Sequence, residues 1–377
     1  MSGQTYLATP AAVPELGIPE SSSTVDVRII DTTGYGEVST SVVFTPQLPG
    51  HDKFIFPSYS FLISNDKNGK HILFDLGMRK DWETFMPEPT IGFVKQIMPF
   101  TVQSNVDEIL DADVAKIGIT TKDISAVIWS HHHFDHRGDL SPFDSNTQLI
   151  VGPGFMKAYS PGYPTDPKST IQETELTSNP VRELDDSAFT LKLGRVPAHD
   201  YFGDGSFYIL STPGHTTGHL AALARVTSES NGSSTFVLLG GDCAHHPGVF
   251  RPTEYLPIPE KVPEAPRSKF GTSPCPGVWL QKYVHPQKSA TEPFLKANLV
   301  VYENPEYGLH SLSAMQEFDA SPDILVCIAH DAGLLGNIDF YPDKLNGWKA
   351  KGLKNAVHWN FCGDFDVKAA KEKAAAA

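Results

Sequence analysis

Cysteine is scarce in this chain, and the few cysteines form no pattern. Neither the close spacing of a cysteine zinc site nor the pairing of a disulfide framework joins Cys243, Cys275, Cys327 and Cys362. Such scattered thiols are typical of a reducing compartment. No stretch comes near the roughly 20 apolar residues that cross a bilayer, and residues 1–20 lack the basic start and apolar core of a secretory signal. The sequence therefore predicts a cytoplasmic protein that does not enter a membrane.

Positive charge is also in short supply. Lysine and arginine number 30 against 44 aspartates and glutamates, which gives a formal net charge of -14. Proteins that bind nucleic acid need a basic surface to contact phosphates, so this balance argues against nucleic acid as a partner. The hydrophobic share of 40% and the charged share of 20% are those of an ordinary globular protein. A small molecule is the expected partner.

Histidine, by contrast, is concentrated in one six-residue run. The run is His131-His132-His133-Phe134-Asp135-His136, and it follows the short apolar segment 124–130, which is typical of a buried strand. On an extended segment His131 and His133 point the same way and can share one ion, whereas Asp135 and His136 lie past a bend and face a second. The pattern predicts two metal positions; a histidine-rich surface loop without metal is the alternative.

Three further strand-like segments end at residues that ligate metals. Segment 207–211 leads into the turn Pro213-Gly214-His215, segment 236–240 into Gly241-Asp242, and segment 324–329 into His330-Asp331. A carboxylate can bridge two cations through its two oxygens, which suits Asp242. We therefore expect His215 to complete the first metal position, His330 to complete the second, and Asp242 to lie between them.

In this order the motifs resemble the metallo-β-lactamase superfamily, whose members carry H-x-H-x-D-H, a P-G-H turn, a G-D and a late histidine. The resemblance runs from about residue 59 to residue 331. It implies an α+β fold, a four-layer αββα sandwich. It also implies one metal on His131, His133 and His215, a second on Asp135, His136 and His330, and Asp242 as the bridge. Asp75, in Phe74-Asp75-Leu76-Gly77, is similar to the family's early aspartate outside the ligand set, and His219 is expected to support the ligands too.

The ligand types favour two zinc ions. Imidazoles and carboxylates without thiolate suit zinc, and iron or manganese are the alternatives. The family's iron-dependent redox branch has glutamate where this chain has His133. That difference disfavours the least expected function, a mononuclear-iron sulfur dioxygenase.

The reaction that the resemblance implies is hydrolysis of a cyclic ester or amide, as in a lactonase or lactamase. Two cations lower the pKa of a bridging water, so that hydroxide attacks the carbonyl; Asp135 and Asp242 take part as ligands. The lactonase branch has a tyrosine three residues after the bridging aspartate, where this chain has His245. His245 or its neighbour His246 is the expected proton donor, because imidazole exchanges protons near neutral pH. A thioesterase of the glutathione or polyketide-releasing type is the alternative.

The remaining expectations concern the layout of the chain. Residues 1–24 are predicted to be a polar arm and 25–377 one catalytic domain with a proline-rich insertion at 247–286, serving as a lid, as a homodimer contact or as surface padding. Residues 82–100 are apolar, carry prolines and are predicted to be irregular; they are expected to wall a pocket for a partly apolar substrate or to pack a satellite core. Strands are predicted at 25–30, 41–44, 58–63, 71–74, 124–130, 148–151, 207–210, 220–226, 236–239 and 324–329, a hairpin turn at 66–69, and helices at 106–115 and 309–319.

Overall fold

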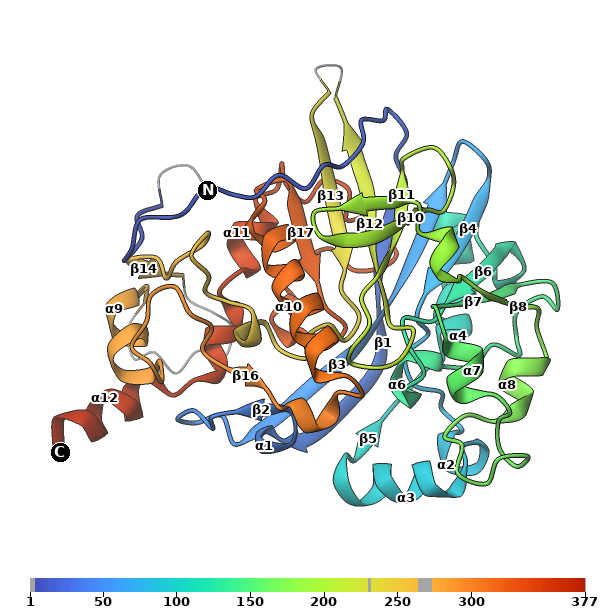
Figure 1. Ribbon diagram of the computed structural model, residues 1–377, viewed down its shortest axis with the longest axis horizontal. Helices are drawn as coiled ribbons and strands as arrows, with labels where there is room; N and C mark the ends of the chain where they lie inside the picture. The colour runs from blue at the N-terminus through green and yellow to red at the C-terminus, as the bar shows by residue number, and fades with distance from the viewer. Residues whose placement is uncertain (1–3, 230–231, 264–272, 377) are drawn as a thin grey trace.

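Two β-sheets form the centre of the molecule, and Figure 1 shows them edge-on. The structure is a computed structural model that describes residues 4–229, 232–263 and 273–376. The first sheet has the strand order β5-β1-β3-β4-β6-β7-β8, and the second has the order β17-β13-β12-β11-β10-β9. The strands of the first sheet are β1 (Asp26–Ser39), β3 (Lys53–Asn65), β4 (Lys70–Phe74), β5 (Phe100–Thr101), β6 (Ile124–Ile128), β7 (Gln148–Val151) and β8 (Val181–Glu183). Those of the second are β9 (Leu191–Leu193), β10 (Val196–Asp200), β11 (Phe207–Ser211), β12 (Leu220–Ser228), β13 (Ser234–Leu239) and β17 (Ile324–Cys327).

Short elements connect these strands. Two small ribbons pair β2 (Phe44–Thr45) with β16 (Lys296–Ala297), and β14 (Lys261–Val262) with β15 (Cys275–Pro276). The helices are α1 (Thr40–Val43), α2 (Trp82–Phe85), α3 (Glu88–Ile97), α4 (Val106–Ala112), α5 (Val114–Ile117), α6 (Phe134–Arg137), α7 (Phe155–Tyr159), α8 (Glu173–Thr177), α9 (Gly277–Trp279), α10 (Pro305–Ala320), α11 (Leu353–Val357) and α12 (Val367–Ala376). The 3-10 helices are η1 (Thr121–Asp123), η2 (Asp186–Ala188), η3 (Pro247–Val249), η5 (Leu299–Val301), η6 (Ala332–Leu334) and η7 (Asn360–Asp364). A short π-helix forms η4 (Leu280–Val284).

Alternation along the strands produces three apolar layers. Phe61 of β3 faces the second sheet and packs in one cluster with Ile209 and Val237. Its neighbour Leu62 points to the opposite face, where the cluster includes Leu110 of α4, because successive strand side chains alternate. The outer face of the second sheet packs against α10. The order helix, sheet, sheet, helix confirms the predicted four-layer αββα sandwich.

Most predicted strands are confirmed, as are the turn at 66–69 and the helix at 309–319, which lies inside α10. The predicted strand at 41–44 is wrong: the chain forms the helical turn α1 there, and only Phe44 enters β2. The hydroxyl of Thr40 donates to the carbonyl of His51 across this turn, so a tertiary contact overrides local strand propensity. The predicted helix at 106–115 breaks at Asp113 into α4 and α5.

The prediction that residues 82–100 are irregular is also wrong. The segment contains α2 and the ten-residue helix α3. Its prolines fall where a helix tolerates them, since Pro87 is the N-cap of α3 and Pro89 lies in its first turn, where the backbone N–H has no intrahelical partner. Position, rather than the number of prolines, decides whether a helix forms.

The arm and the proline-rich segment lie together at one side of the molecule (Figure 1). Described residues of the arm run in extended form, with the amide of Leu7 donating to Ile258 and that of Ala11 to Glu254. Between 247 and 286, the described residues form only η3, η4, α9 and the β14–β15 ribbon; residues 264–272 fall outside the described part. The lid and homodimer roles stay predictions.

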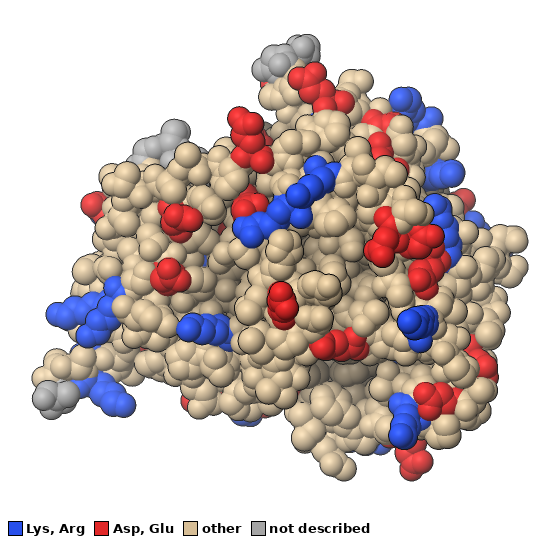
Figure 2. Space-filling model, viewed as in Figure 1, with Lys and Arg blue, Asp and Glu red and all other residues tan. Residues whose placement is uncertain are grey.

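The face of the molecule drawn in Figure 2 carries acidic and basic side chains in a scattered arrangement. On the face in Figure 2, blue and red groups alternate, without a continuous basic patch. Within the described ranges, no helix combines the length and the apolar character that crossing a membrane requires.

Candidate metal centre

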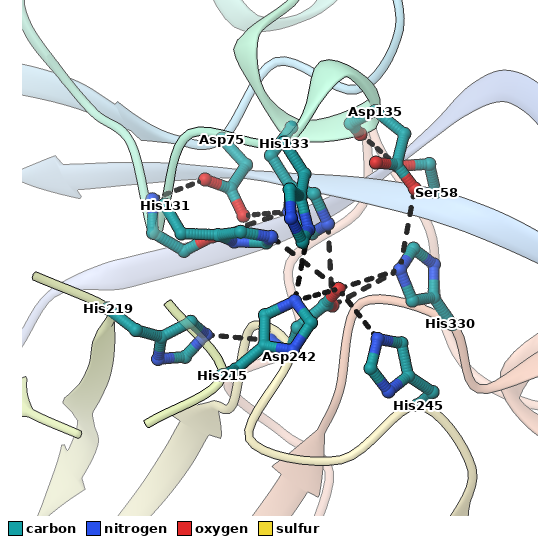
Figure 3. A network of polar contacts seen from close by, with 12 residues as sticks. Ser58, Asp75, His131, His133, Asp135, His215, His219, Asp242, His245 and His330 are labelled. Carbon is teal, nitrogen blue, oxygen red and sulfur yellow. Dashed lines mark hydrogen bonds and ion pairs between the residues drawn. The ribbon is translucent and has the colours of Figure 1, made fainter. Parts of the chain in front are cut away.

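Four strand ends from the two sheets converge on one buried cluster of histidines and aspartates (Figure 3). β6 leads into the histidine run, whose last residues begin α6; β11 leads into the turn with His215, β13 into the turn with Asp242, and β17 into the loop with His330. The six candidate ligands other than His133 are buried, and His133 is half-buried. The candidate ligands that the sequence predicted therefore lie together.

The candidate ligands form two groups with one carboxylate between them. Ligand atoms of His131, His133, His215 and Asp242 lie within 4.8 Å of one another, and so do those of Asp135, His136 and His330. Asp242 contacts both groups: its Oδ2 lies 3.7 Å from His131 Nε2, and its Oδ1 lies 3.1 Å from His330 Nε2. This is the arrangement that a bridging carboxylate requires.

Partners outside the two groups orient the imidazoles. His330 Nδ1 lies 2.7 Å from the carbonyl oxygen of Pro57, and His136 Nδ1 lies 2.8 Å from Asp75 Oδ2. Each contact assigns the ring proton to Nδ1, which leaves the Nε2 lone pair facing the centre. Asp75 also accepts the amide of Ser130 at 2.6 Å, and its backbone has a positive φ of 59°. Asp75, which follows β4 directly, thus links that strand to the segment that carries His131, His133, Asp135 and His136.

His219 supports Asp242 through the backbone. Its Nε2 accepts the Asp242 amide at 3.0 Å, and its Nδ1 lies 2.9 Å from Thr212 Oγ1. Burial lowers the pKa of His219 to about 3, which keeps the ring neutral and able to accept. Gly241, with φ of 49°, packs against this ring, and a Cβ there would lie 2.9 Å from His219 Nε2.

Electrostatics prepare the cluster for a cation. Burial, reinforced by neighbouring imidazoles, holds the pKa of His131 and of His215 well below the usual range, and burial lowers that of His133 to about 4. Burial alone raises the pKa of Asp242, but His330, His136 and His245 outweigh it and hold that pKa well below its usual range. Neutral His131, His133 and His215 beside an ionised Asp242 are the protonation states that the first metal position needs. At the second position, burial alone lowers the pKa of His136 and of His330, but Asp242 and neighbouring carboxylates outweigh it and raise both pKa values. A cation that binds there therefore displaces protons from these two imidazoles.

The donor set fits a pair of metal ions. Within the described part of the chain, His131 Nε2 and His136 Nε2 are buried and make no hydrogen bond. His215 Nε2 and His133 Nδ1 lie 3.0 Å apart, close enough to ligate the same cation. Imidazole nitrogen and carboxylate oxygen in this mixture suit zinc.

Asp75 allows a test of this outer support. We expect Asp75→Asn to weaken metal binding about ten- to a hundredfold, because the amide no longer holds His136 in its ligating orientation. Competition with a coloured chelator measures the affinity. Asp204→Asn is the matched control. Asp204 also accepts a backbone amide, that of Ser206, but it lies before the start of β11, whereas the candidate ligand His215 follows the end of that strand. Equal affinities for wild type and Asp75→Asn would contradict the assignment.

A cavity of about 450 Å³ opens over the cluster. Part of its wall comes from the 82–100 segment, through Pro89, Thr90, Phe93 and Met98, which confirms the predicted pocket wall. Sequence reasoning missed the rest of the wall: Val38, Val42, Val43, Phe54, Phe56, Phe134, Arg137, Thr170 and Val301. The histidines and aspartates of the lining are His132, His245 and five of the candidate ligands, namely His133, Asp135, His215, Asp242 and His330.

The two histidines after Asp242 lie in different places. His245 lines the cavity, with Nε2 3.3 Å from Asp242 Oδ2 and its ring parallel to that of His330 at 5.9 Å. His246 points away, contacts Asp364 at 3.1 Å, and accepts the Gly248 amide on Nδ1. That second contact places the ring proton on Nε2, which faces Asp364, so His246 does not offer this nitrogen as a metal ligand although His51, His246 and Asp364 lie close together. His132 stacks on Tyr159 at 4.0 Å.

Comparisons with known proteins agree with this geometry. Residues 54–224 match the metallo-beta-lactamase superfamily. The metallo-hydrolase mfmC of Annulohypoxylon moriforme is 42% identical over 361 residues, which cover 96% of this chain and 93% of that protein. This chain belongs to the metallo-β-lactamase superfamily. A second superfamily relative, a gamma-lactamase of Fusarium pseudograminearum (strain CS3096), is 42% identical over 93% of this chain and 85% of its own length.

A solved structure supports the metallo-β-lactamase fold. An N-acyl homoserine lactone hydrolase, with N-hexanoyl-L-homoserine bound at its catalytic metal centre, superposes with a TM-score of 0.55 at 17% identity. The match covers 85% of this chain and 99% of that one. At this identity the likeness concerns the fold alone, and the substrate must be argued from this chain's own pocket.

Proposed function

We propose that this metal-dependent hydrolase holds two zinc ions and opens the ring of a cyclic amide or ester. The observation that carries the proposal is the position of Asp242, whose two carboxylate oxygens face two separate groups of imidazoles under an apolar cavity. The two zinc ions, when bound, supply Lewis-acid activation of the attacking water and of the scissile carbonyl.

The chain's own residues supply the rest of the chemistry. Water adds across the ring bond: its oxygen joins the carbonyl carbon, the carbon–nitrogen or carbon–oxygen bond breaks, and a proton goes to the leaving atom. His245 lines the cavity beside Asp242 and serves as the donor of that proton. The apolar wall around Phe56 and Phe134 excludes bulk water from the reacting carbonyl.

The relatives favour a five-membered cyclic amide as the substrate, since one of them is named a gamma-lactamase. A glutathione thioesterase needs cationic groups for the carboxylates of glutathione. Among the described residues lining the cavity, Arg137 is the one cation, and it is already paired. No observation in the pocket favours that alternative.

A substrate screen with metal analysis tests the proposal. We expect protein purified without added metal to contain about two zinc ions per chain, and the zinc-loaded protein to hydrolyse γ-lactams or lactones faster than thioesters. Elemental analysis and ring-opening assays measure both. About one iron per chain without zinc, or turnover confined to thioesters, would contradict it.

A further inference from the structure

The cavity is almost free of net charge apart from the metal centre. Among the described residues that line it, Asp135 and Asp242 are the acidic ones, and both belong to the candidate ligand groups. Arg137, at the end of α6, is the one lysine or arginine among the described residues of the lining. The net charge of the cavity therefore depends on whether another group balances the positive charge of Arg137.

Arg137 is neutralised from behind the pocket wall. Its guanidinium Nη1 lies 2.5 Å from Glu175 Oε2, and its Nη2 donates to the carbonyl of Thr170 at 2.9 Å. The side chains of Arg137 and Glu175 are 2% and 8% exposed, so water screens this pair little. Glu175 itself lies outside the lining and is held in place by the amide of Gln172, as part of the capping box of α8.

The wall beside Arg137 is aromatic. Phe56 contacts the ring of His330 edge-on at 4.8 Å, Phe100 lies 6.1 Å from Phe56, and Phe134 lies 6.3 Å from Phe100. Phe93 continues the series toward the surface, 6.4 Å from Phe134, and is 43% exposed. Phe56, Phe134 and Phe93 line the cavity, and Phe100 packs between them outside the lining. This aromatic part of the wall favours an apolar substrate body.

We propose that Glu175 determines specificity: by cancelling the charge of Arg137, it makes the cavity select uncharged ring substrates over substrates whose body carries a carboxylate. This inference rests on the proposed ring-opening function. An anion entering beside α6 loses its hydration and finds a cation whose charge is already balanced, so its desolvation is not repaid. An uncharged aromatic body has no such cost.

The test changes the charge of Glu175 and keeps its shape. Glu175→Gln still accepts the amide of Gln172 and the guanidinium of Arg137, but it leaves Arg137 with an unbalanced positive charge. The probes are a phenyl-substituted γ-lactam and the same lactam with a carboxylate on the phenyl ring. We expect the ratio of kcat/KM, anionic over neutral, to rise about tenfold or more in Glu175→Gln relative to wild type. Taking the ratio between variants cancels any attraction of the carboxylate to the metals.

A control variant, and a variant that removes the positive rather than the negative charge of the pair, separate an effect on specificity from an effect on stability. Glu108→Gln is matched, because Glu108 is also a capping-box glutamate paired with a cation, Lys80, but it does not line or back the cavity; its ratio should equal that of wild type. Arg137→Gln leaves Glu175 unbalanced instead, and we expect its ratio to fall. Should Glu175→Gln not fold, the direction of the shift in Arg137→Gln decides the question.

Binding measurements separate this inference from the proposed function. Calorimetry with the cyclic-ether analogues of the two probes, which cannot be hydrolysed, gives the same anionic-to-neutral ratio on the zinc-loaded protein. Absence of lactam turnover with a shifted binding ratio would contradict the proposed function and support the role of Glu175. Ratios within twofold of wild type in both charge variants would overturn that role.

Discussion

Replacing Asp242 with alanine is expected to abolish turnover. Among the described residues, this carboxylate alone has oxygens that face both sets of imidazoles, with its Oδ1 3.3 Å from His136 Nε2 and its Oδ2 3.5 Å from His215 Nε2. Without it, the two metal positions would lose their shared ligand. The two cations would also lose the negative charge between them that reduces their mutual repulsion. We expect kcat to fall by three orders of magnitude or more, equivalent to about 4 kcal/mol of activation free energy.

Metal content should fall together with turnover in Asp242→Ala. Elemental analysis is expected to give fewer than two zinc ions per chain, and circular dichroism of the purified variant checks that both sheets are formed. Asp242→Asn, which keeps the shape and one oxygen donor, should recover part of the metal but little of the activity. A fully active Asp242→Ala protein with two zinc ions would refute the bridging position.

The sequence predicts much of this centre because each candidate ligand follows an apolar strand. His215, Asp242 and His330 are far apart in the chain, yet each comes directly after a run of buried residues, and strand ends of packed sheets meet at a common edge. The expected split into two groups is found, although its local geometry differs from strand alternation: β6 ends at Ile128, residues 130–132 form a bend, and α6 begins at Phe134. Local patterns therefore suffice for a site built on strand ends.

Beyond the part from residues 82–100, the pocket wall could not be predicted in the same way, because it is assembled from segments without a local pattern in common. Phe54 and Phe56 lie on β3, Val42 in α1 and Val301 in η5. Each is an ordinary apolar residue in the sequence, and only tertiary packing brings it to the cavity. The pairing of Arg137 with Glu175 is likewise non-local.

The adjacent histidines His245 and His246 show most clearly where prediction of side-chain placement from the sequence fails. His245 and His246 are equivalent in sequence terms, as both follow Asp242 closely. Asp364 contacts His246 from the C-terminal part of the chain, and the amide of Gly248 fixes its other nitrogen. These two contacts hold His246 away from the cavity and leave His245 facing it.

His245→Ala is expected to lower kcat about a hundredfold to ten-thousandfold, the usual contribution of a general acid. The ring lies in the cavity floor between His215 and His330, with centroid distances of 4.8 and 5.9 Å, but it belongs to neither candidate ligand group. Metal content should therefore stay at the wild-type value while turnover falls. His71→Ala is the control, since His71 is a half-buried histidine of β4 that contacts Ser64 and lies outside the cavity lining.

The leaving group decides whether His245 donates a proton or only shapes the pocket. An amine expelled from a lactam needs a proton as the ring bond breaks, whereas a phenolate expelled from an aryl lactone leaves readily without one. If His245 is the donor, the loss in His245→Ala should be large for the lactam and small for the aryl lactone. Equal losses for both substrates would mean that His245 acts through positioning, and the proton would then have to come from solvent.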